Sequence, residues 1–160
     1  MCIPTYENPY RRTVAPGFFH TGQELRVSVT INNHPNGFNV DFCTDKGDYV
    51  AFHFNPRFRN IGGYERDYVV CNSYIPITGW GEEELGGVCH RHPFPFKQNH
   101  SYDIKFVCRP DYWLVKVDGR GLMKYEHRVD PALIDHFRIE GDVRIECVDP
   151  VYDFASSILV

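Results

Sequence analysis

The sequence predicts an all-β fold, either a sandwich or a barrel. Apolar and polar residues alternate with period two in one segment after another, as expected of half-buried strands. Gly, Pro, Asn and Asp separate these segments at short spacing. Aromatic residues make up 15% of the chain, which favours strands over helices. Helical periodicity is almost absent, and only residues 131–136 are a candidate for a single helical turn.

The predicted strands follow from this alternation, taken in chain order. Dipeptides that favour tight turns follow two of the predicted strands. Asp118-Gly119 is a hairpin signal, and Gly141-Asp142 separates the last two strands. We expect less regular ends at about 1–15 and 148–160, and the apolar residues 157–160 could form a terminal strand or be mobile. The alternating segments are 25–31, 38–42, 50–54, 68–72, 102–106, 113–117, 137–139 and 143–147.

Length and composition favour one domain over residues 1–160 and exclude several classes of protein. With 160 residues the chain can build one core of ordinary size. Its net charge of -4 argues against nucleic-acid binding, and no apolar stretch approaches the roughly 20 residues of a membrane span. The N-terminal residues lack the apolar core of a signal peptide, so we expect a cytoplasmic protein whose six cysteines are free thiols.

The segment 51–57 carries a candidate binding site. If Phe52 and Phe54 point to the core, then His53, Asn55 and Arg57 share the opposite face, because residues i, i+2 and i+4 of a strand lie on one side. Burying polar groups in a row is costly unless they have partners. An imidazole, a carboxamide and a guanidinium combine donors and acceptors, which suits a ligand covered in hydroxyl groups.

Nearby segments extend this candidate site. Asn72 falls on the same surface as His53 if Val69 and Cys71 face the core. Trp80 lies between glycines, which favours an exposed aromatic platform for the C–H face of a sugar ring. Glu83 can accept sugar hydroxyls and pair with Arg57, whereas Glu82 and Glu84 are interpreted as solvated. Asn39 and Asp41 are also interpreted as a solvated face, although they could extend the groove to a further sugar. Trp113 is predicted to be in the core.

These motifs together resemble the galectin family. The family's three sugar-binding motifs correspond to residues 53–58, 70–72 and 80–83, in order and at similar spacing, and the resemblance covers about residues 14–148. It implies a jelly-roll β-sandwich of two antiparallel sheets that binds β-galactosides. It also implies roles for the motif residues: His53, Asn55 and Arg57 contact the axial hydroxyl of galactose, Asn72 and Glu83 the next hydroxyls, Trp80 stacks on the ring, and Val70 lines the floor.

One position departs from the family pattern. The arginine that normally ends the third motif is replaced by Leu85, and extra residues follow at 86–90 before Arg91. The resemblance implies that this arginine contacts a second sugar and braces the glutamate. We therefore expect weaker binding of lactose-like disaccharides, or substitution by Arg91.

The sequence also bears on the binding partners and on functions other than sugar binding. The family resemblance implies partners that are β-galactoside glycans on glycoproteins or glycolipids, with export that needs no signal peptide. A galectin-like protein-interaction module with weakened sugar binding is the alternative.

His90 and His92 are too few for a closed metal site, so neither metal nor cofactor is expected. Glu83 is a single clear acid, which argues against a glycosidase and for a non-enzymatic protein. Residues 158–160 could pair two copies as a homodimer or fold back.

Overall fold

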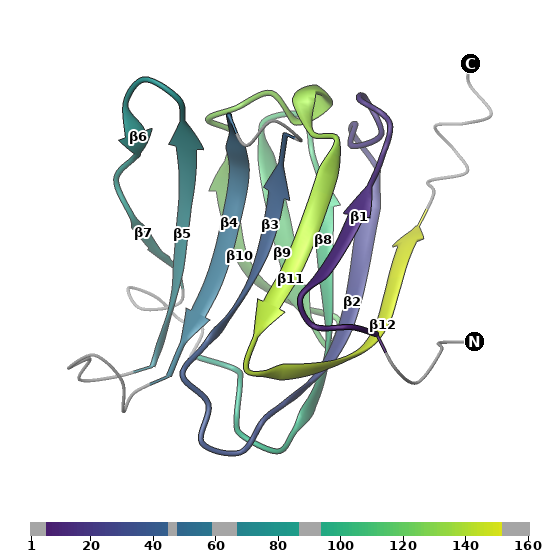
Figure 1. The fold of residues 1–160 in the computed structure, drawn as a ribbon, viewed down its shortest axis with the longest axis vertical. Coiled ribbons are helices and arrows are strands. Elements are labelled where there is room, and N and C mark those ends of the chain that lie inside the picture. Colours follow the sequence, from purple (N-terminus) through teal and green to yellow (C-terminus); the bar gives the residue numbers. More distant parts are fainter. Residues whose placement is uncertain (1–5, 45–47, 59–66, 87–93, 152–160) are drawn as a thin grey trace.

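The fold is a jelly-roll β-sandwich of two antiparallel sheets, as predicted (Figure 1). The computed structural model describes residues 6–44, 48–58, 67–86 and 94–151. The first sheet has the strand order β1-β11-β3-β4-β5-β6, and β7 pairs with β5 beside β6. Its strands are β1 (Tyr10–Thr13), β11 (His136–Gly141), β3 (Phe38–Cys43), β4 (Val50–Arg57), β5 (Tyr68–Ile75), β6 (Gly79–Trp80) and β7 (Glu84–Gly86).

The second sheet lies behind the first in Figure 1 and has the order β10-β9-β8-β2-β12. The predicted hairpin is present between β9 and β10, where Asp118 and Gly119 have φ values of 50° and 80°, as the tight hairpin turn requires. The strands of the second sheet are β10 (Arg120–Glu126), β9 (Tyr112–Val117), β8 (Ser101–Cys108), β2 (Glu24–Ile31) and β12 (Val143–Val151).

Aromatic side chains from the inner faces of both sheets form the core. The rings of Phe42 and Trp113 lie 4.6 Å apart, and those of Phe52 and Tyr125 are stacked at 4.7 Å. Trp113 is buried, as predicted. Burying a Phe side chain contributes roughly 1.5–3 kcal/mol. Since β4 and β5 turn alternate residues to this core, the residues between them must point away from it.

The two end strands and the helical turn differ from the prediction. β1 lies in a segment expected to be irregular, and β12 continues to Val151, because each of them pairs along its length with a neighbouring strand. The predicted helical turn is shorter, a 3-10 helix at Pro131–Leu133 that Asp130 caps by accepting a hydrogen bond from the Ala132 amide. The apolar residues 157–160 lie outside the described residues.

The cysteines are only partly as expected. Cys43, Cys71 and Cys108 are free and buried. Burial raises the pKa of both the Cys43 and Cys108 thiols to about 12, so neither is a thiolate near neutral pH. Cys147 is disulfide-bonded, so the prediction of free thiols is wrong there. Cys147 lies on β12, an edge strand of the second sheet. In the part of the chain that the structure describes, no helical segment has the length and apolar character needed to cross a membrane.

Candidate functional site

A row of polar residues crosses the outer face of the first sheet, here called the polar face. His53 on β4 lies directly opposite Asn72 on β5 and Asp41 on β3, and Asp41 lies opposite Arg138 on β11. Residues that are directly opposite in a sheet share a face. The polar face therefore contains Arg138, Asp41, His53 and Asn72 side by side, which confirms the predicted placement of His53 and Asn72.

Asp41 anchors the His53 side of this face. Its carboxylate accepts a hydrogen bond from the His53 ring through Nδ1. The other carboxylate oxygen accepts from Asn39 at 2.6 Å and from Arg138 at 3.1 Å. Asp41 is only 2% exposed, so the interpretation of Asn39 and Asp41 as a solvated face is wrong for Asp41. Asp41 can be buried because its hydrogen-bonding and charged neighbours compensate the cost of burying a carboxylate.

Arg138 completes this cluster and was not foreseen from the sequence. It pairs with Asp41 and, through Nε at 3.5 Å, with Glu140. Burial lowers the pKa of its guanidinium, but the Asp41 carboxylate outweighs this effect and the pKa lies above its usual value. Arg138 is therefore a permanent cation beside the Asp41–His53 pair.

Asn55 and Arg57 form a second set of contacts on β4. Asn55 donates from Nδ2 to the Phe38 carbonyl at 2.7 Å, and its Oδ1 accepts from Arg57 Nε at the same distance. Arg57 also lies 3.7 Å from the Glu83 carboxylate. The predicted Arg57–Glu83 pair is thus present, and Asn55 holds the guanidinium on its other side.

Asn72 has its amide group fixed by three contacts. Its Oδ1 accepts from the Ser73 amide at 2.8 Å and from Arg128 Nη1 at 3.0 Å, while Nδ2 donates to the Gly81 carbonyl at 2.9 Å. A Cβ at Gly81 would come within 2.9 Å of Arg128 Nη1, so a side chain at this position would displace the guanidinium. The backbone after Trp80 therefore packs directly on the Asn72 side chain.

Trp80 provides an exposed aromatic surface at one end of the polar face. Its side chain is 51% exposed, although its ring lies 5.0 Å from the His53 ring and 5.5 Å from the Tyr74 ring. An aromatic ring that contacts two other rings and stays half-exposed is a surface on which the apolar side of a ligand can rest. The predicted exposure of Trp80 is confirmed.

Val70 and Leu85 lie in one row with Asn55. Asn55 is opposite Val70, and Val70 is opposite Leu85 on β7. Val70 is buried and Leu85 is exposed. The residue that departs from the family pattern therefore borders the polar face. Arg91, His90 and His92 lie outside the described residues.

The contact between Arg128 and Glu84 is, like Arg138, a part of this surface that the sequence does not predict. Arg128 follows β10 of the second sheet, donates from Nη2 to the Glu82 carbonyl at 2.8 Å, and contacts Glu84 at 3.2 Å. Glu84 is exposed, as predicted, and it also pairs with Arg128. No sequence pattern near residues 125–128 indicates a contact across the sandwich.

The described residues present polar contacts without reactive groups. None of their His, Cys, Asp and Glu side chains form a cluster of three that could hold a metal ion. Cys71 lies beside Asn72 but belongs to the core, and burial, with a smaller effect of Glu84, raises the pKa of its thiol well above the usual value. The Cys71 thiol is therefore not available to this surface as a nucleophile.

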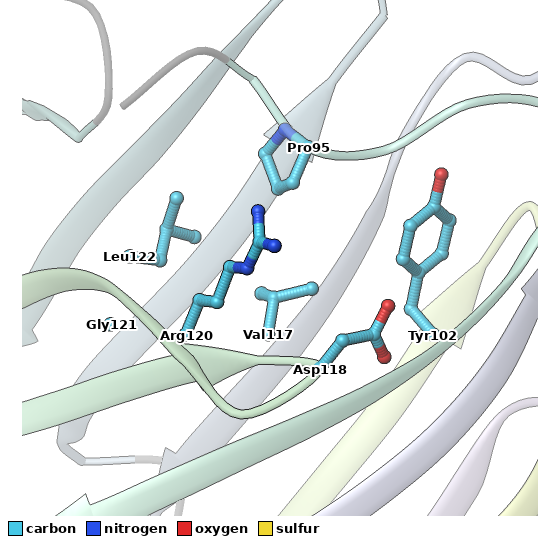
Figure 2. A pocket seen from close by; sticks show the side chains of 7 residues that line it. All are labelled: Pro95, Tyr102, Val117, Asp118, Arg120, Gly121 and Leu122. Carbon is cyan, nitrogen blue, oxygen red and sulfur yellow. The ribbon is translucent and has the colours of Figure 1, made fainter. Parts of the chain in front are cut away.

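A hollow of about 500 Å³ lies elsewhere, by the β9–β10 hairpin (Figure 2). Pro95, Val117 and Leu122 line it with apolar surface. Two of its polar groups already have partners, since the Tyr102 hydroxyl accepts from the Lys97 amide and Asp118 accepts from the Asp103 amide. It lacks the converging polar side chains of the polar face.

Comparison with known proteins identifies this arrangement. The family model described as galactoside-binding lectin matches residues 9–149. The chain belongs to the galectin family. Rat galectin-4 is 29% identical over 150 residues, which are 91% of this chain and 43% of that protein. The 32 kDa β-galactoside-binding lectin of Caenorhabditis elegans is 30% identical over 140 residues, which are 88% of this chain and 45% of that protein.

Solved galectin structures share the fold. The crystal structure of Caenorhabditis elegans galectin LEC-6 superposes with a TM-score of 0.78, covers 94% of this chain and 96% of the other, and is 24% identical. The chain spans less than half the length of the two sequence relatives above. Galectin membership therefore rests on the family model, and the solved structure supports the architecture.

Proposed function

We propose that this chain is a non-enzymatic lectin that binds β-galactosides on glycoproteins or glycolipids through the polar face. Residues 1–160 would form one carbohydrate-recognition domain. The main observation in support of this proposal is that His53, Asn55 and Asn72 are held by protein partners in fixed orientations beside the exposed Trp80 ring. A site arranged before the ligand arrives loses less conformational entropy on binding.

The hydrogen-bond partners specify what each group can offer a sugar. A carboxylate only accepts, so His53 carries its proton on Nδ1 toward Asp41 and, when neutral, presents Nε2 as an acceptor. Asn55 has one N–H committed to the Phe38 carbonyl and a second that is available to a ligand. A hydroxyl between His53 and Asn55 can donate to the first and accept from the second. This pairing suits the axial hydroxyl that distinguishes galactose from glucose.

The remaining contacts follow the same logic. Trp80 would cover the apolar side of the galactose ring, Asn72 and Glu83 would bind the next hydroxyls, and Val70 would line the floor below them. Arg57, held between Asn55 and Glu83, would donate to the axial hydroxyl. Arg91 stays a prediction, as do cytoplasmic synthesis, signal-independent export and the pairing of two copies.

The test compares two sugars that differ in one stereocentre. Methyl β-galactoside and methyl β-glucoside are titrated against the full chain while tryptophan fluorescence is recorded, because Trp80 is exposed and Trp113 is buried. We expect saturable binding of the galactoside alone, and loss of the signal in Trp80→Leu. Equal responses to both sugars would refute the assignment of the axial hydroxyl.

A second candidate function rests on Leu85. Without an arginine there, the chain could be an interaction module whose sugar binding has weakened. Retention on immobilised lactose, with elution by free lactose, supports the lectin. Passage through the column, together with no response to the galactoside in the titration, favours the interaction module.

A further inference from the structure

Arg128 connects the two sheets at the edge of the polar face. It follows β10 of the second sheet, yet its guanidinium contacts Asn72 of β5 and the backbone and side chain of the segment after Trp80. The guanidinium also lies over the Tyr125 ring, 5.2 Å from its centre, and Tyr125 is buried. Stacking and three acceptors together hold the guanidinium in one orientation.

The contact with Arg128 determines which atoms of Asn72 face a ligand. A guanidinium has only donors, so the atom of Asn72 that meets it must be the amide oxygen. That oxygen also accepts from the Ser73 amide, and one N–H is committed to the Gly81 carbonyl. The group left for a ligand is the second N–H of Asn72.

The segment that bears Trp80 depends on the same guanidinium. Arg128 donates to the Glu82 carbonyl and pairs with Glu84, on the two sides of Glu83 in the sequence. Leu85, where the family pattern has an arginine, is a hydrocarbon and can form neither contact. Arg128 lies outside this segment in the sequence and is thus a cation that can brace it.

We propose that Arg128 is a positioning residue of the galactoside site, which makes Asn72 a donor toward the ligand and braces the segment 81–84. The proposal rests on the proposed function. It also restricts the ligand: the group opposite Asn72 must be an acceptor such as a hydroxyl or ether oxygen. A sugar with an ammonium group in that place is rejected.

The experiment uses calorimetric titration of the full chain with lactose and with lactose analogues that lack single hydroxyls of the galactose ring. The hydroxyl opposite Asn72 is the one whose removal no longer matters in Asn72→Ala. We expect Arg128→Met to weaken lactose binding about tenfold, as the loss of a charge-assisted contact would. In that variant the penalty for removing this hydroxyl shrinks to less than about twofold, while the other penalties are unchanged.

Two further variants keep the test decisive. Arg144→Met removes an arginine paired with Glu146 on the second sheet and leaves all affinities as in the parent. Arg128→Lys retains the positive charge but cannot bridge the same acceptors, so it gives an intermediate penalty even if Arg128→Met folds poorly. Equal weakening for every analogue, or no weakening at all, overturns the role of Arg128. A parent chain that binds neither lactose nor methyl β-galactoside overturns the proposed function instead.

Discussion

The His53 side and the Asn72 side of the polar face are held in place in different ways. His53 is oriented by Asp41, which Arg138 pairs with in turn, and all three belong to adjacent strands of one sheet. Asn72 is oriented by Gly81 and by Arg128, which follows strand β10 of the other sheet. One side is therefore fixed by the register of strands within one sheet, and the other by contacts from outside the strand register, one of them from a residue that follows a strand of the second sheet.

This difference makes the two sides unequally vulnerable. Register is specified by the whole hydrophobic pattern of the sheet, so the backbone on the His53 side can survive a single substitution. The Asn72 side depends on a few side chains whose loss frees a loop. We expect substitutions on the His53 side to act through charge and those on the Asn72 side through geometry.

The largest effect is expected for Asp41→Ala. It leaves Arg138 and His53 without their shared carboxylate and frees the His53 proton to move between the ring nitrogens. Affinity for lactose should fall about a hundredfold, which corresponds to about 2.8 kcal/mol. Calorimetric titration measures this. The matched control is Asp135→Ala, which removes the carboxylate of the His136 pair on β11 and should leave affinity unchanged. Binding by Asp41→Ala as tight as in the parent would contradict the role given to Asp41.

Gly81→Ala tests the Asn72 side with a single methyl group. The added Cβ would approach Arg128 Nη1 to 2.9 Å and Asn72 Oδ1 to 3.3 Å, so the guanidinium must move. We expect lactose affinity to fall about tenfold with little loss of stability, because only one hydrogen-bonded contact is displaced. Gly121→Ala is the matched control, since nothing lies within 4 Å of its Cβ position. Unchanged affinity in Gly81→Ala would show that this packing is not needed.

Leu85→Arg should strengthen the weaker side. Position 85 is exposed and lies in the row of Val70 and Asn55, so an arginine there can reach a second sugar. Lactose affinity should rise about fivefold, less than a fully buried charge-assisted contact would give. The neutral Leu85→Gln variant should not show this gain. A gain of equal size in both variants would mean that the charge at position 85 is irrelevant.

Tyr125→Phe should have the smallest effect on binding. The Tyr125 hydroxyl lies 2.6 Å from Ser73 Oγ, which also donates to the Ala51 carbonyl at 2.8 Å. Removing the hydroxyl should cost about 1 kcal/mol of unfolding free energy and change lactose affinity by less than about twofold. Denaturant unfolding and titration measure the two quantities. A large loss of affinity would mean that the Asn72 side depends on Ser73 and Tyr125 as well as on Arg128.

The sequence predicts the long strands and the first half of the site well. The alternation at 25–31, 38–42 and 50–54 carries the signal, and the same period places His53, Asn55 and Arg57 on one face. β6 and β7 have two and three residues, too few to show any periodicity. Their position follows from pairing with β5, which is a tertiary contact.

The charged partners of the site could not be predicted in the same way. An aspartate between apolar residues of a strand is typical of a solvated face, and the burial of Asp41 depends on Arg138, which is 97 residues away. Arg128 and Asn72 are 56 residues apart and belong to segments of different sheets. Family resemblance identified the residues proposed to touch the sugar, but it did not indicate that Asp41, Arg138 and Arg128 hold them.

The division of one sheet edge between β6 and β7 has a consequence for association of the chain. A long open edge offers unpaired backbone groups to which a strand of another molecule can add, and this leads to aggregation. Here β5 is covered by two short pieces, one opposite Tyr74 and Ile75 and the other opposite residues 69–71. Neither piece is long enough to template an incoming strand. The polar face can thus lie beside a sheet edge without making that edge a site of fibre growth.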